Sequence, residues 1–172
     1  MEIFDVMEDG GYEQLVIATD KSVGLRAFVA IHDTTLGPAL GGCRIWSYPT
    51  EKEAMSDVLR LAKAMTYKNA FAGLELGGGK SLIWTDPSHA KSEAMLMAFG
   101  KYVETLNGRY YTTEDVGSTV DDMVVVKGAT NHVVGLPIEL GGSGDPSKAT
   151  GLGVFQGMKA AVKHTLKVDS LA

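Results

Sequence analysis

Two lysines, Lys68 and Lys80, stand twelve residues apart and have the chemistry of a substrate site. Lys68 ends a predicted amphipathic helix, and Lys80 follows a predicted glycine turn at 77–79, ahead of an apolar run. If both ammonium groups reach one pocket, the first can bind a carboxylate, and its charge makes the second easier to deprotonate. This pairing suits chemistry on an amino acid or a keto acid.

Two further clusters of small and polar residues lie at the ends of predicted elements, at 37–42 and 112–117, and the second contains Asp115. Open α/β sheets gather their ligand sites at such ends. Each cluster alone has an ordinary structural explanation. Lys68 suits the C-terminal end of a helix dipole, Asp115 suits a loop or a cap, and glycines shape turns. Their joint occurrence favours a functional site.

An α/β framework is needed to bring these clusters together. Runs at 13–18 and 25–31 flank a polar turn and predict a β-hairpin, and residues 37–42 predict a turn. Helices are predicted at four places: from a capping box at Thr50, over 91–106, from Thr119, and from 147–150 through 162. Further strands are predicted at 43–46, 73–76, 81–84, 110–112 and 132–134. This alternation predicts a single α/β domain over residues 1–172, with a mostly parallel mixed sheet flanked by helices.

The composition excludes several classes of protein. A net charge of −5 over 172 residues argues against a nucleic-acid binder. Cys43 is the only cysteine, so neither an intrachain disulfide nor a thiolate metal site is expected, and a reducing, cytoplasmic location fits best. No metal site is expected from the four histidines either, because none has ligand spacing. No secretory signal and no apolar run of about 18 residues is present, so no membrane association is expected.

Two glycine motifs suggest nucleotide binding, but neither fits its pattern. Gly79, Lys80 and Ser81 resemble a phosphate loop, yet position 74 is leucine where the motif needs glycine, and a strand follows where it needs a helix. The glycines at 151–157 resemble a dinucleotide fingerprint, but no buried strand precedes them. Those glycines instead suggest a helix that packs closely against a neighbour.

Five motifs, in the right order along essentially the whole chain, resemble the N-terminal, substrate-binding and dimerisation domain of the glutamate/leucine/phenylalanine/valine dehydrogenases. They occupy residues 32–42, 65–70, 77–80, 106–110 and 113–117. The leucine-specific members are the nearest match. The resemblance implies NAD-dependent oxidative deamination of an L-amino acid, with L-leucine and related branched-chain amino acids as substrates and 2-oxo acids as products.

The resemblance also implies roles for individual residues. Lys68 matches the lysine that holds the substrate α-carboxylate, Lys80 the catalytic lysine that activates water, and Asp115 the acid that exchanges protons with the amino group. The pocket for the substrate side chain matches Leu40, Gly41, Gly42, Thr113 and Val134. Thr113 and Val134 replace the Ala and Thr typical of leucine dehydrogenases. Because one methylene contributes only about 1–3 kcal/mol of discrimination, preference among leucine, isoleucine, valine and larger substrates stays open.

Members of this family continue into a second domain that binds NAD. The chain is therefore expected to lack the cofactor site, to supply a substrate half-site to a homo-oligomer, and to be inactive alone. The interface is expected near Phe28, Val29 and Ile31. Two alternatives remain: a phenylalanine or valine dehydrogenase domain, and a truncated, non-catalytic oligomerisation module.

Overall fold

A computed structural model describes residues 2–85 and 91–171. One of the four histidines from which no metal site is expected, His89, lies outside the described residues. Five α-helices and five strands account for most of these residues. The strands are β1 (Gln14–Asp20), β2 (Leu25–Asp33), β3 (Ala39–Trp46), β4 (Gly77–Trp84) and β5 (Tyr110–Glu114). The helices are α1 (Ile3–Gly10), α2 (Glu51–Phe71), α3 (Glu93–Glu104), α4 (Val120–Lys127) and α5 (Ser147–Leu166), with a short 3-10 turn, η1 (Ile138–Leu140).

The five strands form one mixed sheet in the order β1-β2-β4-β3-β5. The pairs β1/β2 and β2/β4 are antiparallel, whereas β3/β4 and β3/β5 are parallel. The predicted α/β class with a mixed sheet is confirmed, and so is the β1/β2 hairpin. The parallel half of the sheet carries the residues singled out for chemistry, since β3, β4 and β5 lie side by side there.

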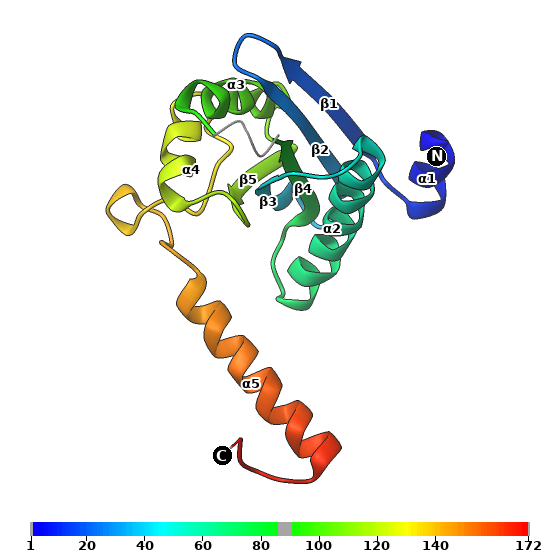
Figure 1. The fold of residues 1–172 in the computed structure, drawn as a ribbon, viewed down its shortest axis with the longest axis vertical. Helices are drawn as coiled ribbons and strands as arrows, with labels where there is room; N and C mark the ends of the chain where they lie inside the picture. The colour runs from blue at the N-terminus through cyan, green and yellow to red at the C-terminus, as the bar shows by residue number, and fades with distance from the viewer. Residues whose placement is uncertain (1, 86–90, 172) are drawn as a thin grey trace.

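Helices cover both faces of the sheet (Figure 1). On one face α2 packs its Ala54, Val58, Leu59 and Ala62 stripe against Phe28, Ala30 and Leu82. On the other face α3 and α4 enclose a larger apolar core that includes Phe99, Met123 and Tyr110. Burial of these apolar surfaces on both faces is the main force that holds the three layers together.

Side-chain caps explain where three helices begin. The hydroxyls of Thr50, Ser92 and Thr119 accept hydrogen bonds from backbone N–H groups three residues ahead, at the starts of α2, α3 and α4. Such caps satisfy N–H groups that have no partner inside the helix. The predicted starts at Thr50 and Thr119 are thereby confirmed. Helix α1 was not predicted, because Glu2 at its N-cap makes no side-chain cap.

One strand prediction and one turn prediction near Lys80 are wrong. Residues 73–76 form no strand, and the glycines at 77–79, predicted as a turn, are the first three residues of β4. Lys80 therefore stands inside a strand. Similarly, β3 begins at Ala39, within the predicted turn at 37–42, and the strand expected at 132–134 is a single bridge between Thr112 and Val133.

The expected interface residues lie in the chain's own interior. Phe28, Val29 and Ile31 are at most 3% exposed and belong to the two apolar cores, so their side chains are not available to another subunit. These three side chains therefore cannot make the contact themselves, and an interface near them stays a prediction. The hairpin strand in front of them, β1, has Ile17 59% exposed.

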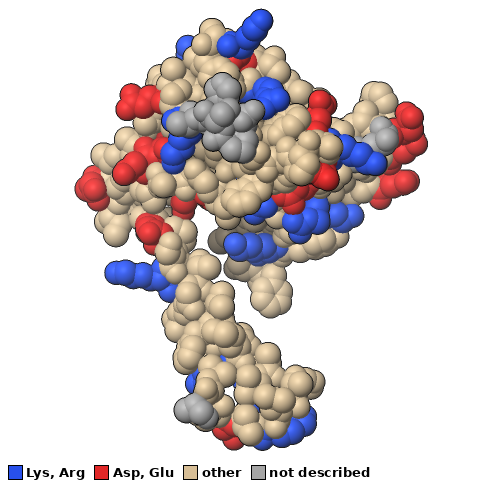
Figure 2. Space-filling model, viewed as in Figure 1, with Lys and Arg blue, Asp and Glu red and all other residues tan. Residues whose placement is uncertain are grey.

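Helix α5 extends away from the sheet and its covering helices as an arm (Figure 1). Figure 2 shows charged side chains where the arm leaves the body and at its far end, with mostly uncharged residues between them. Nothing within the described residues approaches a Cβ built at Gly151, Gly153 or Gly157 to 4 Å. The close neighbour predicted for these glycines is thus not part of the described chain. Over residues 2–85 and 91–171, no helix has the length and apolar character needed to cross a membrane.

Candidate active site

The residues predicted to meet line one groove of about 1140 Å³. Strand β4 carries Lys80, the last turn of α2 carries Lys68, and Asp115 directly follows β5. Of the residues expected to form the side-chain pocket, four also line the groove: Leu40, Gly42, Thr113 and Val134. The three charged groups thus lie on one surface of the molecule.

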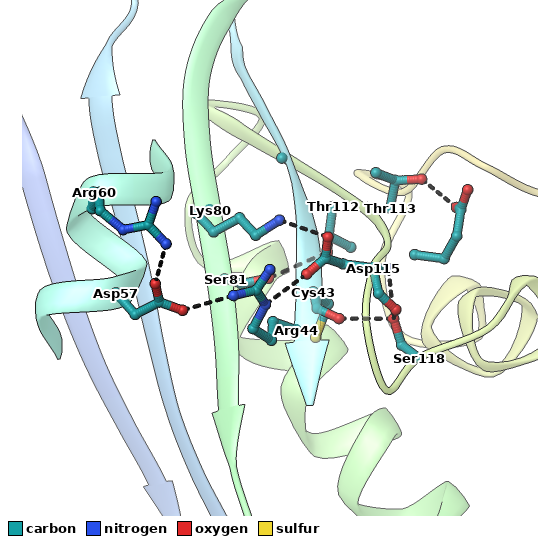
Figure 3. A network of polar contacts seen from close by, with 12 residues as sticks. Cys43, Arg44, Asp57, Arg60, Lys80, Ser81, Thr112, Thr113, Asp115 and Ser118 are labelled. Carbon is teal, nitrogen blue, oxygen red and sulfur yellow. Dashed lines mark hydrogen bonds and ion pairs between the residues drawn. The ribbon is translucent and has the colours of Figure 1, made fainter. Parts of the chain in front are cut away.

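Lys80 and Asp115, which both line the groove, form an ion pair (Figure 3). The Lys80 Nζ atom lies 2.9 Å from Asp115 Oδ1, and the lysine side chain is only 6% exposed. Burial lowers the pKa of Lys80 below its ordinary value, although the Asp115 carboxylate opposes that shift. Burial therefore favours the neutral amine of Lys80, which can accept a proton.

Lys68 is exposed and makes no ion pair or hydrogen bond within the described part of the chain. Its ammonium is consequently open to an anion that enters the groove. The sequence predicted that its charge would lower the pKa of Lys80. The structure gives a different cause, because burial is the largest contribution and the cation that adds to it is Arg44.

Arg44, on β3, is a component of the site that sequence reasoning missed. Its Nε donates to Asp115 Oδ2 at 3.0 Å, and its Nη1 donates to Asp57 Oδ2 at 2.7 Å (Figure 3). Asp57, on α2, also accepts from the Tyr48 hydroxyl and from Arg60. A run of alternating charges thus extends from α2 to the Lys80–Asp115 pair. An arginine in an otherwise apolar strand segment was the available signal.

Gly41 and Gly42 are needed because a side chain at either position would clash with a neighbouring strand or with the segment after β5. A Cβ at Gly41 would lie 1.7 Å from the Gly79 carbonyl oxygen, so β3 and β4 can approach only with glycine there. Gly41 is buried and is not among the groove-lining residues, so its role in the side-chain pocket stays a prediction. A Cβ at Gly42 would lie 2.7 Å from Asp115 Cβ. Glycine at 42 therefore makes room for the acid itself.

Gly78 determines how closely α2 approaches β4. A Cβ at that position would lie 2.1 Å from the backbone nitrogen of Thr66. With no side chain in between, the last turns of α2 lie directly against the strand. Asn69 strengthens this contact, because its Nδ2 donates to the Gly77 carbonyl oxygen at 2.6 Å. The contact brings Lys68 to the groove that Lys80 enters from β4.

The wall of the groove combines apolar and polar groups. Leu40 and Val134 supply apolar surface, and Val134 is 39% exposed. The Thr113 hydroxyl donates to the Glu114 carboxylate, which also lines the groove and was not singled out from the sequence. Across residues 2–85 and 91–171, no cluster of three or more His, Cys, Asp and Glu side chains is arranged to hold a metal ion.

Comparison with known families places this arrangement in context. Residues 13–132 match the dimerisation domain of the Glu/Leu/Phe/Val dehydrogenases. The chain belongs to this family. The match covers β1 to β5 and α2 to α4, and it therefore includes Lys68, Lys80, Arg44 and Asp115.

Individual family members resemble the chain over nearly its whole length. The leucine dehydrogenase of Geobacillus stearothermophilus is 57% identical over 171 residues, which are 99% of this chain and 47% of that protein. The valine dehydrogenase of Streptomyces virginiae is 52% identical over 157 residues, 91% of this chain and 44% of that protein. The crystal structure of L-tryptophan dehydrogenase from Nostoc punctiforme gives a TM-score of 0.76 at 40% identity and covers 98% of this chain and 47% of that chain. The chain thus spans about half the length of the relatives it matches.

The geometry found in this family member can perform two chemical tasks. An exposed ammonium at Lys68 can bind a carboxylate, since charge-assisted hydrogen bonds of this kind are strong. A buried lysine with a lowered pKa, paired to a carboxylate, can take up and release protons in the same groove. Together the two tasks suit a molecule that carries a carboxylate close to a reacting carbon.

Proposed function

We propose that the complete protein catalyses NAD-dependent oxidative deamination of L-leucine and related branched-chain L-amino acids to 2-oxo acids. This chain supplies the substrate half-site. The observation that carries the proposal is the Lys80–Asp115 ion pair, which shares one groove with the unpaired ammonium of Lys68. Leucine and valine dehydrogenases among the most similar relatives support it further.

In this proposal Lys68 binds the α-carboxylate of the amino acid. Its ammonium is exposed to the groove and makes no bond to another described residue, so no internal partner has to be displaced. The ion pair with the substrate places the α-carbon deeper in the groove, toward Lys80 and Asp115. Fixing the substrate at one end in this way supplies orientation, which is a large part of catalysis of reactions between two groups.

Asp115 and Lys80 then move protons. The Asp115 carboxylate accepts a proton from the substrate ammonium, which leaves the neutral amine that can be oxidised to an imine. Lys80 in its neutral form takes a proton from the water molecule that adds to the imine carbon. Burial favours this neutral form, and it places the pKa of Lys80 below its ordinary value of 10.5. Activity should consequently rise with pH through the pKa of Lys80.

Removal of hydride from the α-carbon is the chemistry that NAD supplies. The described residues do not build a dinucleotide site, because the glycines at 151–157 lie inside α5 and no strand leads into that helix. NAD binding is therefore assigned to a second domain of the complete protein. The described residues of this chain bind the substrate and handle its protons.

The substrate preference, the assembly and the location belong to the same proposal. Leu40 and Val134 present apolar surface that suits a branched aliphatic side chain, and Thr113 borders the same space. A valine dehydrogenase is the second candidate, favoured by the 52% identical relative. The family's description as a dimerisation domain supports a homo-oligomer. The buried, unpaired Cys43 suits a reducing, cytoplasmic compartment.

The decisive experiment replaces Lys80 in the complete protein. Lys80→Ala should abolish leucine-dependent formation of NADH while the melting temperature stays close to that of the parent. Lys52→Ala is the matched control, because Lys52 is an exposed lysine at the start of α2, outside the groove. Near-parental rates in the Lys80 variant would refute the catalytic assignment. A parent that forms no NADH with any branched-chain amino acid would refute the function.

A further inference from the structure

We propose that Arg44 is a positioning residue, which holds the Asp115 carboxylate between two cations and limits its attraction for Lys80. The proposal deepens the proposed function and rests on it for its effect on turnover. Each oxygen of the carboxylate has its own cation: Oδ1 lies 2.9 Å from Lys80 Nζ, and Oδ2 lies 3.0 Å from Arg44 Nε. The orientation of the acid is thereby fixed from both sides (Figure 3).

Arg44 is itself held from behind. Its Nη1 donates to Asp57 Oδ2 at 2.7 Å, and Asp57 is fixed on α2 by the Tyr48 hydroxyl at 2.5 Å. A planar guanidinium can bind two carboxylates along different edges at once, which a lysine ammonium on a flexible stem cannot do with fixed geometry. Arg44 thus transmits the rigid position of α2 to the acid that follows β5.

The strand register places Arg44 on the face of the sheet that Lys80 occupies. Arg44 is paired with Leu82, and Lys80 lies two residues before Leu82 on β4. Residues two apart on a strand point to the same face. Leu82 belongs to the core beneath α2, so Arg44, Lys80 and α2 share one side of the sheet. Arg44 can therefore reach Asp57 on α2 and Asp115 at the same time.

The backbone of Asp115 has a separate support. Its N–H donates to Ser118 Oγ at 2.9 Å, and the Ser118 hydroxyl donates to the Cys43 carbonyl oxygen at 2.7 Å. These bonds fix the main chain but leave the carboxylate free to rotate. Among the described residues, only Lys80 and Arg44 pair with that carboxylate. Loss of Arg44 would leave the orientation of the acid to the catalytic lysine alone.

Arg44 also acts on the protonation of Lys80. The side chains of Arg44 and Asp115 are each 21% exposed, so their charges are screened less than those of a surface pair. The Arg44 cation lowers the pKa of Lys80, whereas Asp115 raises it. Without Arg44 the Asp115 carboxylate would pair with Lys80 alone, and Lys80 would stay protonated up to a higher pH. The other titratable groups that face Lys80 or line its groove are Cys43, Lys68, Glu114, Asp121 and Asp145.

The first test measures kcat/KM against pH for the complete protein and for Arg44→Gln. In the variant the acidic limb of the profile should move to higher pH by about one unit. At a fixed pH on that limb, kcat/KM should therefore be about tenfold lower than in the parent. Arg60→Gln is the matched control. Arg60 binds the other oxygen of Asp57 at 2.6 Å and is 70% exposed, but it pairs with no other described acid. Its limb should not move.

Arg44→Lys separates charge from geometry. A lysine keeps the cation near Lys80 but cannot span Asp57 and Asp115, so the limb should stay near that of the parent while kcat falls. This variant also replaces Arg44→Gln should the latter fail to fold. Parental kcat and an unmoved limb in the lysine variant would overturn the positioning role.

A second measurement does not depend on turnover. Acetic anhydride labels neutral amines, and mass spectrometry of the peptide that contains Lys80 gives the pH of half-labelling. This midpoint should be higher in Arg44→Gln than in the parent and unchanged in Arg60→Gln. If the parent fails to oxidise branched-chain amino acids, the proposed function is refuted, and the labelling midpoint still decides the role of Arg44. An unchanged midpoint in folded Arg44→Gln overturns the proposal.

Discussion

Gly42→Ala tests whether the position of Asp115 depends on an absent side chain. A Cβ at position 42 would lie 2.7 Å from Asp115 Cβ and 2.7 Å from the Glu114 carbonyl oxygen, whereas ordinary contacts begin at 3.4 Å. The segment that follows β5 would have to retreat by about 0.7 Å to reach ordinary contact. The retreat moves the acid, because its own Cβ is one of the two atoms in the way.

The expected size of the effect follows from the ion pairs. Asp115 lies 2.9 Å from Lys80 and 3.0 Å from Arg44, so a shift of this size takes at least one pair out of hydrogen-bonding range. Misplacement of a reacting group by about 1 Å can cost about 100-fold in rate. We therefore expect kcat/KM for leucine to fall between about 10-fold and 100-fold. Overpacking should also destabilise the fold by about 1–3 kcal/mol.

Gly100→Ala is the control that separates catalysis from stability. A Cβ at Gly100 would lie 2.9 Å from Ala129 Cβ and from the Val126 carbonyl oxygen, between α3 and α4 and outside the groove. Comparable crowding there should lower the melting temperature and leave the kcat/KM of the folded enzyme unchanged. Steady-state kinetics and thermal denaturation of both variants of the complete protein give the comparison. A folded Gly42→Ala enzyme within about twofold of parental kcat/KM would refute the reasoning.

Two further substitutions test the pocket wall and the framework. Thr113→Ala removes a hydroxyl that borders the groove and binds Glu114, so the added space should favour leucine over valine by up to about 100-fold in kcat/KM; a ratio equal to the parent's would remove residue 113 from the pocket. Thr119→Ala removes the hydroxyl of the α4 capping box and should cost about 1 kcal/mol, measured as a lower melting temperature, while Thr119→Ser should restore it. A melting temperature that does not change in the alanine variant would contradict the importance of that cap.

Helices were predictable from the sequence because their signals are local. Thr50 and Thr119 indicate the starts of α2 and α4, because their hydroxyls accept hydrogen bonds from backbone N–H groups three residues further on. The helix ending at Lys68 was predicted to be amphipathic, and Ala54, Val58, Leu59 and Ala62 on α2 are indeed buried on one face. The one missed helix, α1, lacks a side-chain cap, and its remaining signal is Gly11, whose φ of 75° ends the helix in the left-handed conformation.

The glycines at 77–79 misled the prediction because their reason lies far away in the chain. Glycine is rare inside strands and common in turns, so a turn is the natural inference. In the structure a Cβ at these glycines would clash with Asp33, Thr66 or Tyr110, which belong to three other elements. No local pattern contains that information. The register of β4, and with it the exact place of Lys80, follows from packing alone.

The sequence pointed to the charged residues of the candidate site but not to the side chains that support them. The resemblance to the family pointed to Lys68, Lys80 and Asp115, and all three line the groove. Arg44 and Asp57 escaped notice because they stand 71 and 58 residues from Asp115, and nothing in the sequence ties them to it. Side chains that act through a third residue have no characteristic spacing.

The close contact between α2 and β4 has a consequence for how specificity can change. The separation of Lys68 from Lys80 is set where helix meets bare strand at Gly78, whereas the shape of the wall is set by Leu40, Thr113 and Val134. Exchange of a wall side chain does not alter the contact between α2 and β4. Substitutions in the wall can thus change which amino acid fits the proposed site. The distance between the amines of Lys68 and Lys80 stays the same, because main-chain packing sets it.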